Sequence, residues 1–370
     1  MRNLFKQTMT AIVLAAAIFV SCFGCTPATK VTFAFDGDFK QISPFYEGYA
    51  IVSDLTGDKL IDTQGNSVLT ESYDQILGVS EGLICVEQAG KYGFLNLDGS
   101  IAIPLQYYSA TIFSENFARI TLRHGYGMQF NFIDKEGNQL FDFAEGSTKC
   151  QLQTRLGESV TVEISNTIDF SNGVAAIANQ QQYWAMIDSE SRLLTDFVFQ
   201  EIQPFTNTIA KCKDMQGRLI YVNAQGNTVF SLNADDSFSC ISERIRFVRD
   251  NLFGFVDDKG TTIIQAKYFT ATDFGKDTPY AIVTDSENIA YVIDLNGNAV
   301  KIQANVSEFN SFSDGIAVLR LTDNSYAYVD TQGQISKQRF SYADTCAYGL
   351  CPVKQGNQFG YFEKSLLIFG

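Results

Sequence analysis

Few residues in this sequence have the types and spacing that catalysis needs. There is one histidine, His124, beside the Gly-Tyr-Gly run at 125–127. One imidazole cannot build a multi-histidine zinc site, and a histidine next to a turn is typical of an exposed residue rather than a general base. No glycine-rich phosphate loop precedes a helical pattern. The sequence therefore predicts no catalytic residue, no metal site and no cofactor.

Carboxylates are the remaining candidates for chemistry, and many occupy one recurring position. Asp or Asn, two residues and Gly form a repeated four-residue motif. Asp or Asn favours the first position of a type I turn because its side chain accepts from the backbone two residues on, and Gly favours the fourth. We therefore interpret these residues as structural turns. The seven pairs are Asp62 and Gly65, Asn96 and Gly99, Asp134 and Gly137, Asn223 and Gly226, Asp257 and Gly260, Asp294 and Gly297, and Asp330 and Gly333.

These turns recur along the whole chain. Successive turn glycines lie 34 to 38 residues apart, except between Gly137 and Gly226. A degenerate copy with Ser191 in place of the glycine fills that interval, and the remaining excess places an insertion at 141–168. A constant period of this size indicates a propeller, a solenoid or an array. The insertion is either part of a binding face or a tolerated surface excursion.

Each unit has a second signature upstream, which reads aromatic-x-x-Gly-x-Ala/Ile-x-Val. Examples begin at Phe45 and Phe312, and weaker copies bring the number of units to about nine. The residues after the glycine alternate between two faces, which is the period of a β-strand. A second strand, the turn, a third strand and a short fourth strand follow. The pattern predicts four short strands in each unit.

At this point the chain resembles the WG-repeat proteins of bacteria. The best unit runs through 80–86 (SEGLICV), 91–99 (KYGFLNLDG) and the Ile103-Pro104 return, and the resemblance covers roughly residues 40–365. It implies an extracytoplasmic or interaction role, with no catalysis and no particular ligand. The chain departs from the family at its tryptophan. The aromatic residues at that position are Tyr92, Tyr126, Phe253 and Phe359, while Trp184 precedes Ala185 rather than glycine.

The first 25 residues predict a lipoprotein signal peptide. Arg2 and Lys6 precede an apolar run at 11–20, which is too short to span a bilayer as a helix. Residues 19–22 (FVSC) resemble a lipobox, so we expect Cys22 to be lipidated, with Cys25 as the alternative and a cleaved, unlipidated signal as the other interpretation. The predicted organisation is a signal peptide at 1–25, a tether at 26–38 and a repeat domain at 39–370.

The net charge of the chain narrows the class of partner that it could bind. The net charge is −14, which argues against a nucleic-acid partner because proteins that bind nucleic acids need a basic surface.

The cysteines of the repeat domain have a different interpretation. Cys85, Cys212 and Cys351 fall on the Gly-x-Ala-x-Val strand, where small core residues are expected. We therefore expect mostly free, buried thiols. Cys346 with Cys351 could close a local loop, and Cys150 or Cys240 could pair across insertions.

Together these patterns predict an all-β fold of tandem repeats of about 35 residues. A β-propeller-like ring is favoured, and an open β-solenoid of hairpin units is the alternative. The predicted function is that of a non-enzymatic, exported lipoprotein, anchored to the cell envelope by its lipid, that binds or scaffolds a protein or cell-wall ligand. The alternative is a carbohydrate-active envelope enzyme that uses carboxylates on one face.

Overall fold

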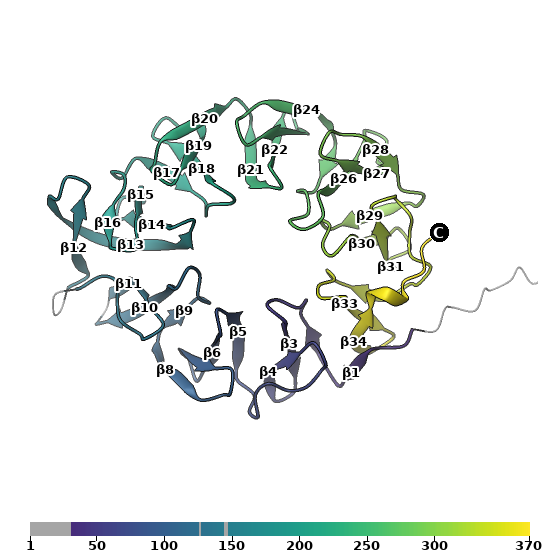
Figure 1. Ribbon diagram of the computed structural model, residues 1–370, viewed down its shortest axis with the longest axis horizontal. Coiled ribbons are helices and arrows are strands. Elements are labelled where there is room, and N and C mark those ends of the chain that lie inside the picture. Colours follow the sequence, from purple (N-terminus) through teal and green to yellow (C-terminus); the bar gives the residue numbers. More distant parts are fainter. Residues whose placement is uncertain (1–30, 126, 144–146) are drawn as a thin grey trace, which may run out of the picture.

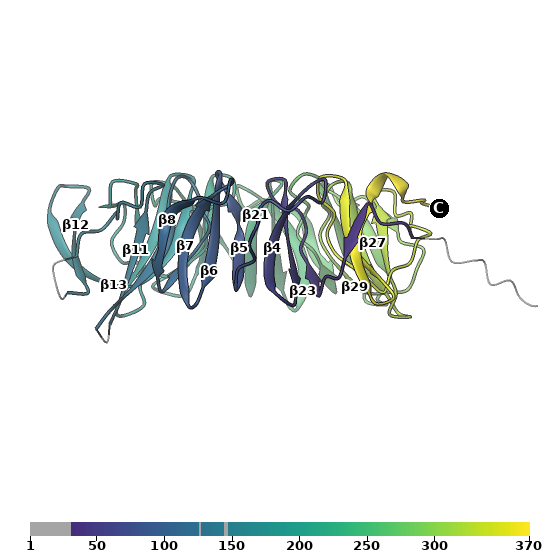
Figure 2. The ribbon, with the colours of Figure 1, turned by 90° about the horizontal axis from the view of Figure 1, so that it is seen from below.

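The computed structural model describes residues 31–125, 127–143 and 147–370, and almost all regular structure in these ranges is β-strand. The strands form mostly small antiparallel sheets arranged as a ring around a central opening (Figure 1). One sheet is larger, because a single pairing joins the fourth and fifth blades into nine strands, among them the parallel pair of β12 (Lys149–Thr154) and β16 (Arg192–Leu193). Seen from the side, the ring is a flat disc whose strands run roughly along its short axis (Figure 2). The all-β, propeller-like fold predicted from the repeats is confirmed.

Each repeat forms one blade, whose first strand borders the opening and whose last strand lies at the rim (Figure 1). Blades one to three contain β2 (Gln41–Ile42), β3 (Tyr49–Asp54) and β4 (Gly57–Asp62); β5 (Gln75–Ser80), β6 (Leu83–Gln88), β7 (Lys91–Asn96) and β8 (Ile101–Tyr107); and β9 (Ser109–Ala110), β10 (Ala118–His124) and β11 (Gly127–Ile133). Blades four to six contain β13 (Ser159–Ser171), β14 (Val174–Asn179), β15 (Trp184–Ile187) and β16 (Arg192–Leu193); β17 (Phe199–Ile202), β18 (Ile209–Asp214), β19 (Leu219–Asn223) and β20 (Thr228–Leu232); and β21 (Asp236–Ile241), β22 (Arg244–Arg249), β23 (Leu252–Asp257) and β24 (Thr262–Tyr268).

The last three blades complete the circle. They contain β25 (Thr270–Ala271), β26 (Tyr280–Thr284), β27 (Ala290–Asp294) and β28 (Ala299–Lys301); β29 (Val306–Phe309), β30 (Ile316–Leu321) and β31 (Tyr326–Asp330); and β32 (Tyr342–Ala343), β33 (Leu350–Gln355), β34 (Gln358–Glu363) and β1 (Phe35–Gly37). A short 3-10 helix, η1 (Lys364–Leu366), follows β34. The described residues thus form nine blades, which agrees with the expected number of repeats.

An N-terminal strand closes the ring. β1 pairs with β34 in antiparallel register, with Phe35 opposite Tyr361, and so supplies the rim strand of the ninth blade. The Tyr361 hydroxyl donates to the carbonyl of Ser43 in the first blade. Residues 35–37 lie within the segment that the sequence assigned to a tether, so that assignment is wrong for them. The tether prediction missed β1 because three residues pairing with a strand over 300 positions away leave no periodic pattern.

The core lies between blades. The aromatic residue that opens the upstream signature is buried in each of six blades and packs against the preceding blade. Phe113 meets Phe94 with ring centroids 4.9 Å apart, and Phe274 meets Phe255 at 5.0 Å, both in edge-on geometry. Such aromatic pairs contribute about 0.5–1.5 kcal/mol beyond the burial of their area. The six residues are Phe45, Phe113, Phe170, Phe205, Phe274 and Phe312.

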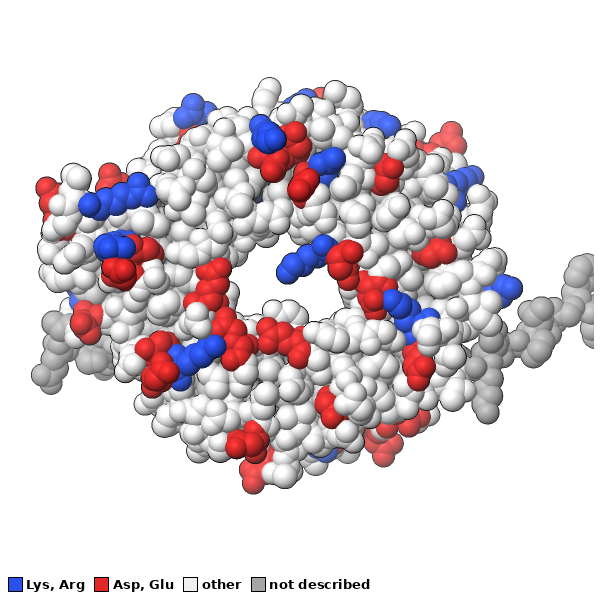
Figure 3. Space-filling view, viewed as in Figure 1, with Lys and Arg blue, Asp and Glu red and all other residues white. Residues whose placement is uncertain are grey.

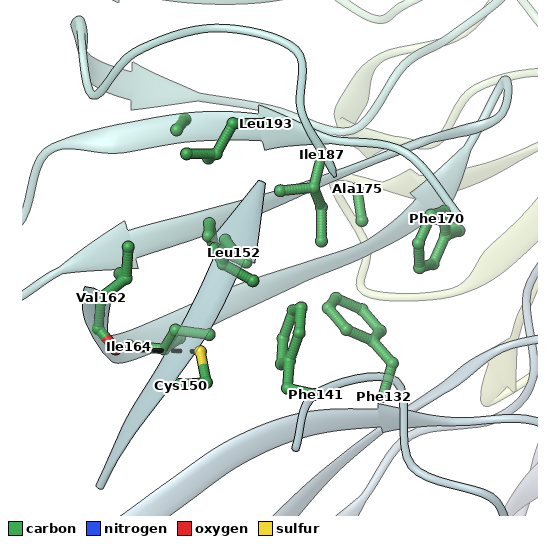
Figure 4. Close-up of a cluster of buried hydrophobic side chains, with 12 residues drawn as sticks. Phe132, Phe141, Cys150, Leu152, Val162, Ile164, Phe170, Ala175, Ile187 and Leu193 are labelled. Carbon is green, nitrogen blue, oxygen red and sulfur yellow. Dashed lines mark hydrogen bonds between the residues drawn. The ribbon is translucent and has the colours of Figure 1, made fainter. Parts of the chain in front are cut away.

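Residues 149–163 of the insertion form a hairpin on the outside of the ring. β12 (Lys149–Thr154) pairs with the first half of β13, and β13 then continues to Ser171 as the first strand of the fourth blade. Cys150 and Leu152 of the hairpin pack into one cluster with Phe132 of the third blade and Ala175 of the fourth (Figure 4). The hairpin therefore covers the outer end of the interface between these two blades.

Candidate binding surface at the inner turns

The turn between the first and second strands of each blade, here called the inner turn, contains the acidic position of the upstream signature. Glu47, Glu81, Glu115 and Asp314 occupy it, each with φ between 48° and 53°. This left-handed conformation is uncommon for residues other than glycine, asparagine and aspartate. The inner turns lie where first strands border the opening, so their side chains gather around one mouth of the ring.

Carboxylates of the inner turns bind the next blade. The Glu47 Oε2 accepts from the backbone N–H of Glu81 at 3.1 Å, and both Glu81 carboxylate oxygens accept from the N–H of Asn116 at 3.1 and 3.2 Å. The Glu115 carboxylate accepts from the N–H groups of Asn172 at 2.6 Å and Gly173 at 2.7 Å. Each acid thus fixes the following inner turn with charge-assisted hydrogen bonds.

The same arrangement recurs on the other side of the ring. Asp277 Oδ2 accepts from the N–H of Asp314 at 2.8 Å, and Asp314 Oδ2 accepts from the N–H of Gly349 at 2.8 Å. Lys364 forms an ion pair with Asp314. The acidic position of the repeat is therefore a link between blades, a role that the sequence pattern did not indicate because the partner is a backbone group one repeat away.

Basic residues form a second set of links, from the third position after the signature glycine. Arg119 donates to Asp169 of the next blade at 2.7 Å, Lys211 to Asp236 at 2.9 Å, and Arg246 to Asp273 at 2.9 Å. Each also donates to a backbone carbonyl of the same neighbouring blade. Other repeats have an apolar residue at this position, such as Ile51 and Val318. A cation in place of that apolar residue is the sequence signal that could have revealed these links between blades.

Two exposed tyrosines lie on the inner turns of adjacent blades. Tyr46 of the first blade is 59% exposed, and Tyr348 of the ninth blade is 60% exposed. Tyr46 also lines an apolar pocket of about 280 Å³ between the first and second blades. Figure 3 shows acidic side chains along the edge of the central opening. The mouth of the ring thus combines exposed aromatic surface, an apolar pocket and negative charge.

A wider groove crosses the seam between the ninth and first blades. It measures about 820 Å³, and its walls are the exposed tips of turns and the β1–β2 connection. Asp38, Lys40, Asn357 and Gln358 are among its polar lining residues. Polar and apolar surface line this groove in similar amounts, so it is a weaker candidate than the mostly apolar pocket at the inner turns.

The predicted turn residues have the geometry of the motif. In all seven, the glycine N–H donates to the carbonyl of the Asp or Asn three residues earlier at 2.8–3.1 Å, and glycine φ lies between 74° and 84°. In six of the seven the first side chain accepts from the backbone two residues on, as Asp294 does from Asn296 at 2.9 Å. Asn96 instead donates to the Ser100 hydroxyl at 2.9 Å. The side-chain hydrogen bond from Asn298 is the largest cause that holds the pKa of Asp294 below its ordinary value. A lowered pKa suits a turn carboxylate and not a general acid.

The structure places the other predicted residues as follows. Cys346 and Cys351 form a disulfide, and Cys85, Cys150, Cys212 and Cys240 are buried free thiols. His124 ends β10 opposite Gly127. Cys22 and Cys25 lie outside the described residues. Within the described ranges no group of three metal-ligating side chains converges, and no helix there is long and apolar enough to cross a membrane.

Comparisons with known proteins agree with the repeat pattern. Three segments, 60–92, 92–123 and 253–285, match the family model described as WG containing repeat. No curated protein sequence matches the chain significantly.

Solved structures match over most of the chain at low identity. The crystal structure of a computationally designed protein, Ika8, shares 11% identity with a TM-score of 0.40, covering 90% of this chain and 98% of that one. BamB from Moraxella catarrhalis shares 10% with a TM-score of 0.44, covering 81% and 99%. A structure described as the eukaryotic initiation factor shares 13% with a TM-score of 0.45, covering 86% and 99%. Three segments of this chain are therefore similar to the WG containing repeat, and they fall on strands of blades one to three and of blades six and seven.

Proposed function

We propose that this protein is a non-enzymatic binding module of the bacterial cell envelope that holds a partner at the inner-turn mouth of its ring. The observation that carries the proposal is the apolar pocket beside the exposed Tyr46 at that mouth. Clefts with mostly apolar walls and a few polar groups are the usual places where proteins bind ligands. A rigid ring of blades suits such a role because it presents the surface without rearrangement.

The carboxylates support binding over hydrolysis. Glycosidases need a pair of carboxyl groups that face a substrate across a cleft. Here Glu47, Glu81 and Glu115 are each committed to backbone N–H groups of the next blade. Every carboxyl pKa shift that is resolved among the described residues is downward, as for Asp62, whereas a general acid needs a raised pKa. The proposal therefore assigns these acids to structure and to charge, not to catalysis.

The location of the binding surface is testable in living cells. A photoreactive amino acid in place of Tyr46 is expected to crosslink to a discrete partner after illumination. The matched control places the same group at Ile101, which is 65% exposed on the rim strand β8. Crosslinks that form equally at both sites, or only at Ile101, would contradict the proposal. Co-sedimentation with purified cell-wall sacculi, performed alongside, separates a wall ligand from a protein partner.

The envelope location is part of the same proposal and has its own test. Cys22, or else Cys25, would carry acyl chains whose burial in the membrane contributes about 0.8 kcal/mol per CH₂ group. Metabolic labelling with an alkynyl fatty acid is expected to mark the wild-type chain and to fail in Cys22→Ala. Labelling lost only in Cys25→Ala would assign the other cysteine. Labelling retained when both are replaced would refute the lipid anchor.

A further inference from the structure

We propose that the apolar pocket between the first and second blades accepts an aromatic or aliphatic side chain from a positively charged segment of a partner protein. The inference rests on the proposed function and specifies its partner. The pocket is lined by Tyr46, Tyr49 and Leu60 of the first blade, Gly78 and Val79 of β5, and Ile112 of the third blade.

The pocket lies where the second blade departs from the commonest form of the repeat. At the position that packs against the preceding blade, six blades have phenylalanine, the sixth and ninth have Cys240 and Cys346, and the second has Val79. Val79 belongs to the same buried cluster as Leu60 of the first blade, so the smaller side chain leaves space at this interface. Gly78 precedes it, and a Cβ there would lie 3.3 Å from Ile112 Cγ2. Two small residues in succession thus keep the pocket open.

The lining selects an apolar side chain. Besides the tyrosine hydroxyls, the one polar side chain that lines the pocket belongs to Ser43. A sugar would leave its buried hydroxyl groups without partners, at a cost of about 1–3 kcal/mol each. An apolar cavity of about 150 Å³ holds a benzene molecule. At about 280 Å³ this pocket has room for a phenylalanine, leucine or methionine side chain.

The charge around the pocket selects the flanking residues. Glu47, Glu81 and Glu115 lie on the inner turns of the first three blades, and Lys135 pairs with Glu81 at 2.9 Å. These four side chains sum to a charge of −2, and the whole chain has a net charge of −14. Lysine or arginine beside the inserted side chain would therefore be attracted during approach and after docking. An acidic segment would be repelled.

A synthetic peptide tests this assignment with the full-length chain in detergent. The probe is a fluorescein-labelled dodecapeptide of lysine and glycine with one central phenylalanine, and binding is followed by fluorescence anisotropy. Replacing the phenylalanine by glycine is expected to weaken binding by about ten- to a hundredfold, the value of burying one such side chain. Replacing the lysines by glutamates is expected to abolish binding. Equal binding of the peptide without phenylalanine would overturn the role of the pocket.

Substitutions in the protein give the matched test. Val79→Phe restores the residue found in six other blades and fills the pocket, so it is expected to weaken binding at least tenfold while the thermal midpoint stays the same or rises. Tyr46→Asn removes one wall of the pocket, and Tyr348→Asn is its control, because both tyrosines are equally exposed. Binding should fall with Tyr46→Asn and persist with Tyr348→Asn. Wild-type affinity in both Val79→Phe and Tyr46→Asn would overturn the inference.

The outcomes separate this inference from the function on which it rests. If crosslinks form at position 46 in cells but the wild-type chain binds no lysine-phenylalanine peptide, the binding function stands and the class of occupant is wrong. If soluble cell-wall glycan binds there instead, the peptide assignment is likewise overturned. If neither crosslinks nor any ligand is found at the mouth, the proposed function fails as well.

Discussion

The Lys211–Asp236 link gives the sharpest test of how blades are held together. The Lys211 side chain is 4% exposed, and its Nζ contacts Asp236 Oδ1 at 2.9 Å and the Ser237 carbonyl at 2.7 Å. Glu201 lies farther away, at 3.8 Å. The Asp236 side chain is 51% exposed. The two partners are thus unequal, since losing the acid leaves a buried cation, whereas losing the cation leaves a carboxylate that water can solvate.

The expected costs differ accordingly. Breaking a buried ion pair from one side costs about 3–5 kcal/mol, and replacing its buried charge by an apolar side chain of similar volume is often close to neutral. Because Glu201 and the Ser237 carbonyl remain, Asp236→Asn should cost about 2–3 kcal/mol. Lys211→Met should cost less than about 1 kcal/mol. The double variant should recover most of the loss, because it no longer contains the unpaired ammonium.

Thermal unfolding followed by circular dichroism measures these differences. An unfolding entropy of about 2.1 cal/mol/K per residue gives roughly 0.7 kcal/mol/K for the described residues. A loss of 3 kcal/mol then lowers the midpoint by about 4 °C, and the double variant should lie within about 1.5 °C of wild type. If Lys211→Met loses as much as Asp236→Asn, then the burial of Lys211 is not what makes the link asymmetric, and this reasoning is refuted.

Three further predictions concern closure, thiols and pH. Deleting residues 31–38 removes β1 and the contact between the Phe35 and Tyr361 rings, whose centroids are 5.0 Å apart, so gel filtration should show self-association and the melting midpoint should fall; an unchanged monomer of wild-type stability would show that β1 is dispensable. Burial raises the pKa of Cys85 to about 12 and that of Cys150 to about 11, so mass spectrometry at pH 8 should find both unalkylated in the native protein and modified after denaturation; alkylation of either in the native state would contradict the described burial. Hydrogen bonds from Ser100 and Asn298 are the largest causes that lower the pKa of Asp98 and of Asp294 in the folded protein. The two carboxylates therefore stabilise the fold fully above their unfolded pKa near 4, and this stabilisation is lost as the pH falls through their lowered folded pKa. A melting midpoint that rises between pH 4 and pH 2.5 would refute this direction.

The repeat and its turns were predictable because both are local. Asp62 and Gly65, like their six counterparts, are three residues apart, and the turn needs only their own backbone and side chains. The residues after Gly48 alternate between two faces, and this local pattern is enough to predict a strand. These signals recur at one period, so the number of repeats predicts the number of blades, and the strand pattern in each repeat predicts the all-β class.

The links between blades were not predictable because their partners are one repeat away or backbone groups. Glu115 lies in a turn, and its role as an acceptor is visible only once Asn172 of the next blade is placed beside it. Arg246 and Asp273 are 27 residues apart, with no pattern joining them. The pocket was harder still to predict from the sequence. It depends on Val79, a smaller side chain than phenylalanine, and this difference in size matters only when the blades pack together.

The strand that closes the ring also sets the order in which the chain can finish folding. β1 precedes every other described strand, and its partner β34 follows all of them, so the ribosome makes β34 after the other strands of the ring. Local blades can form as they are made, because each meander pairs residues close in sequence. The ninth blade must wait for a contact between the first and the last described strands, with its edge strand unpaired in the meantime. A chain cut short before β34 would leave β1 without its partner and the ring open.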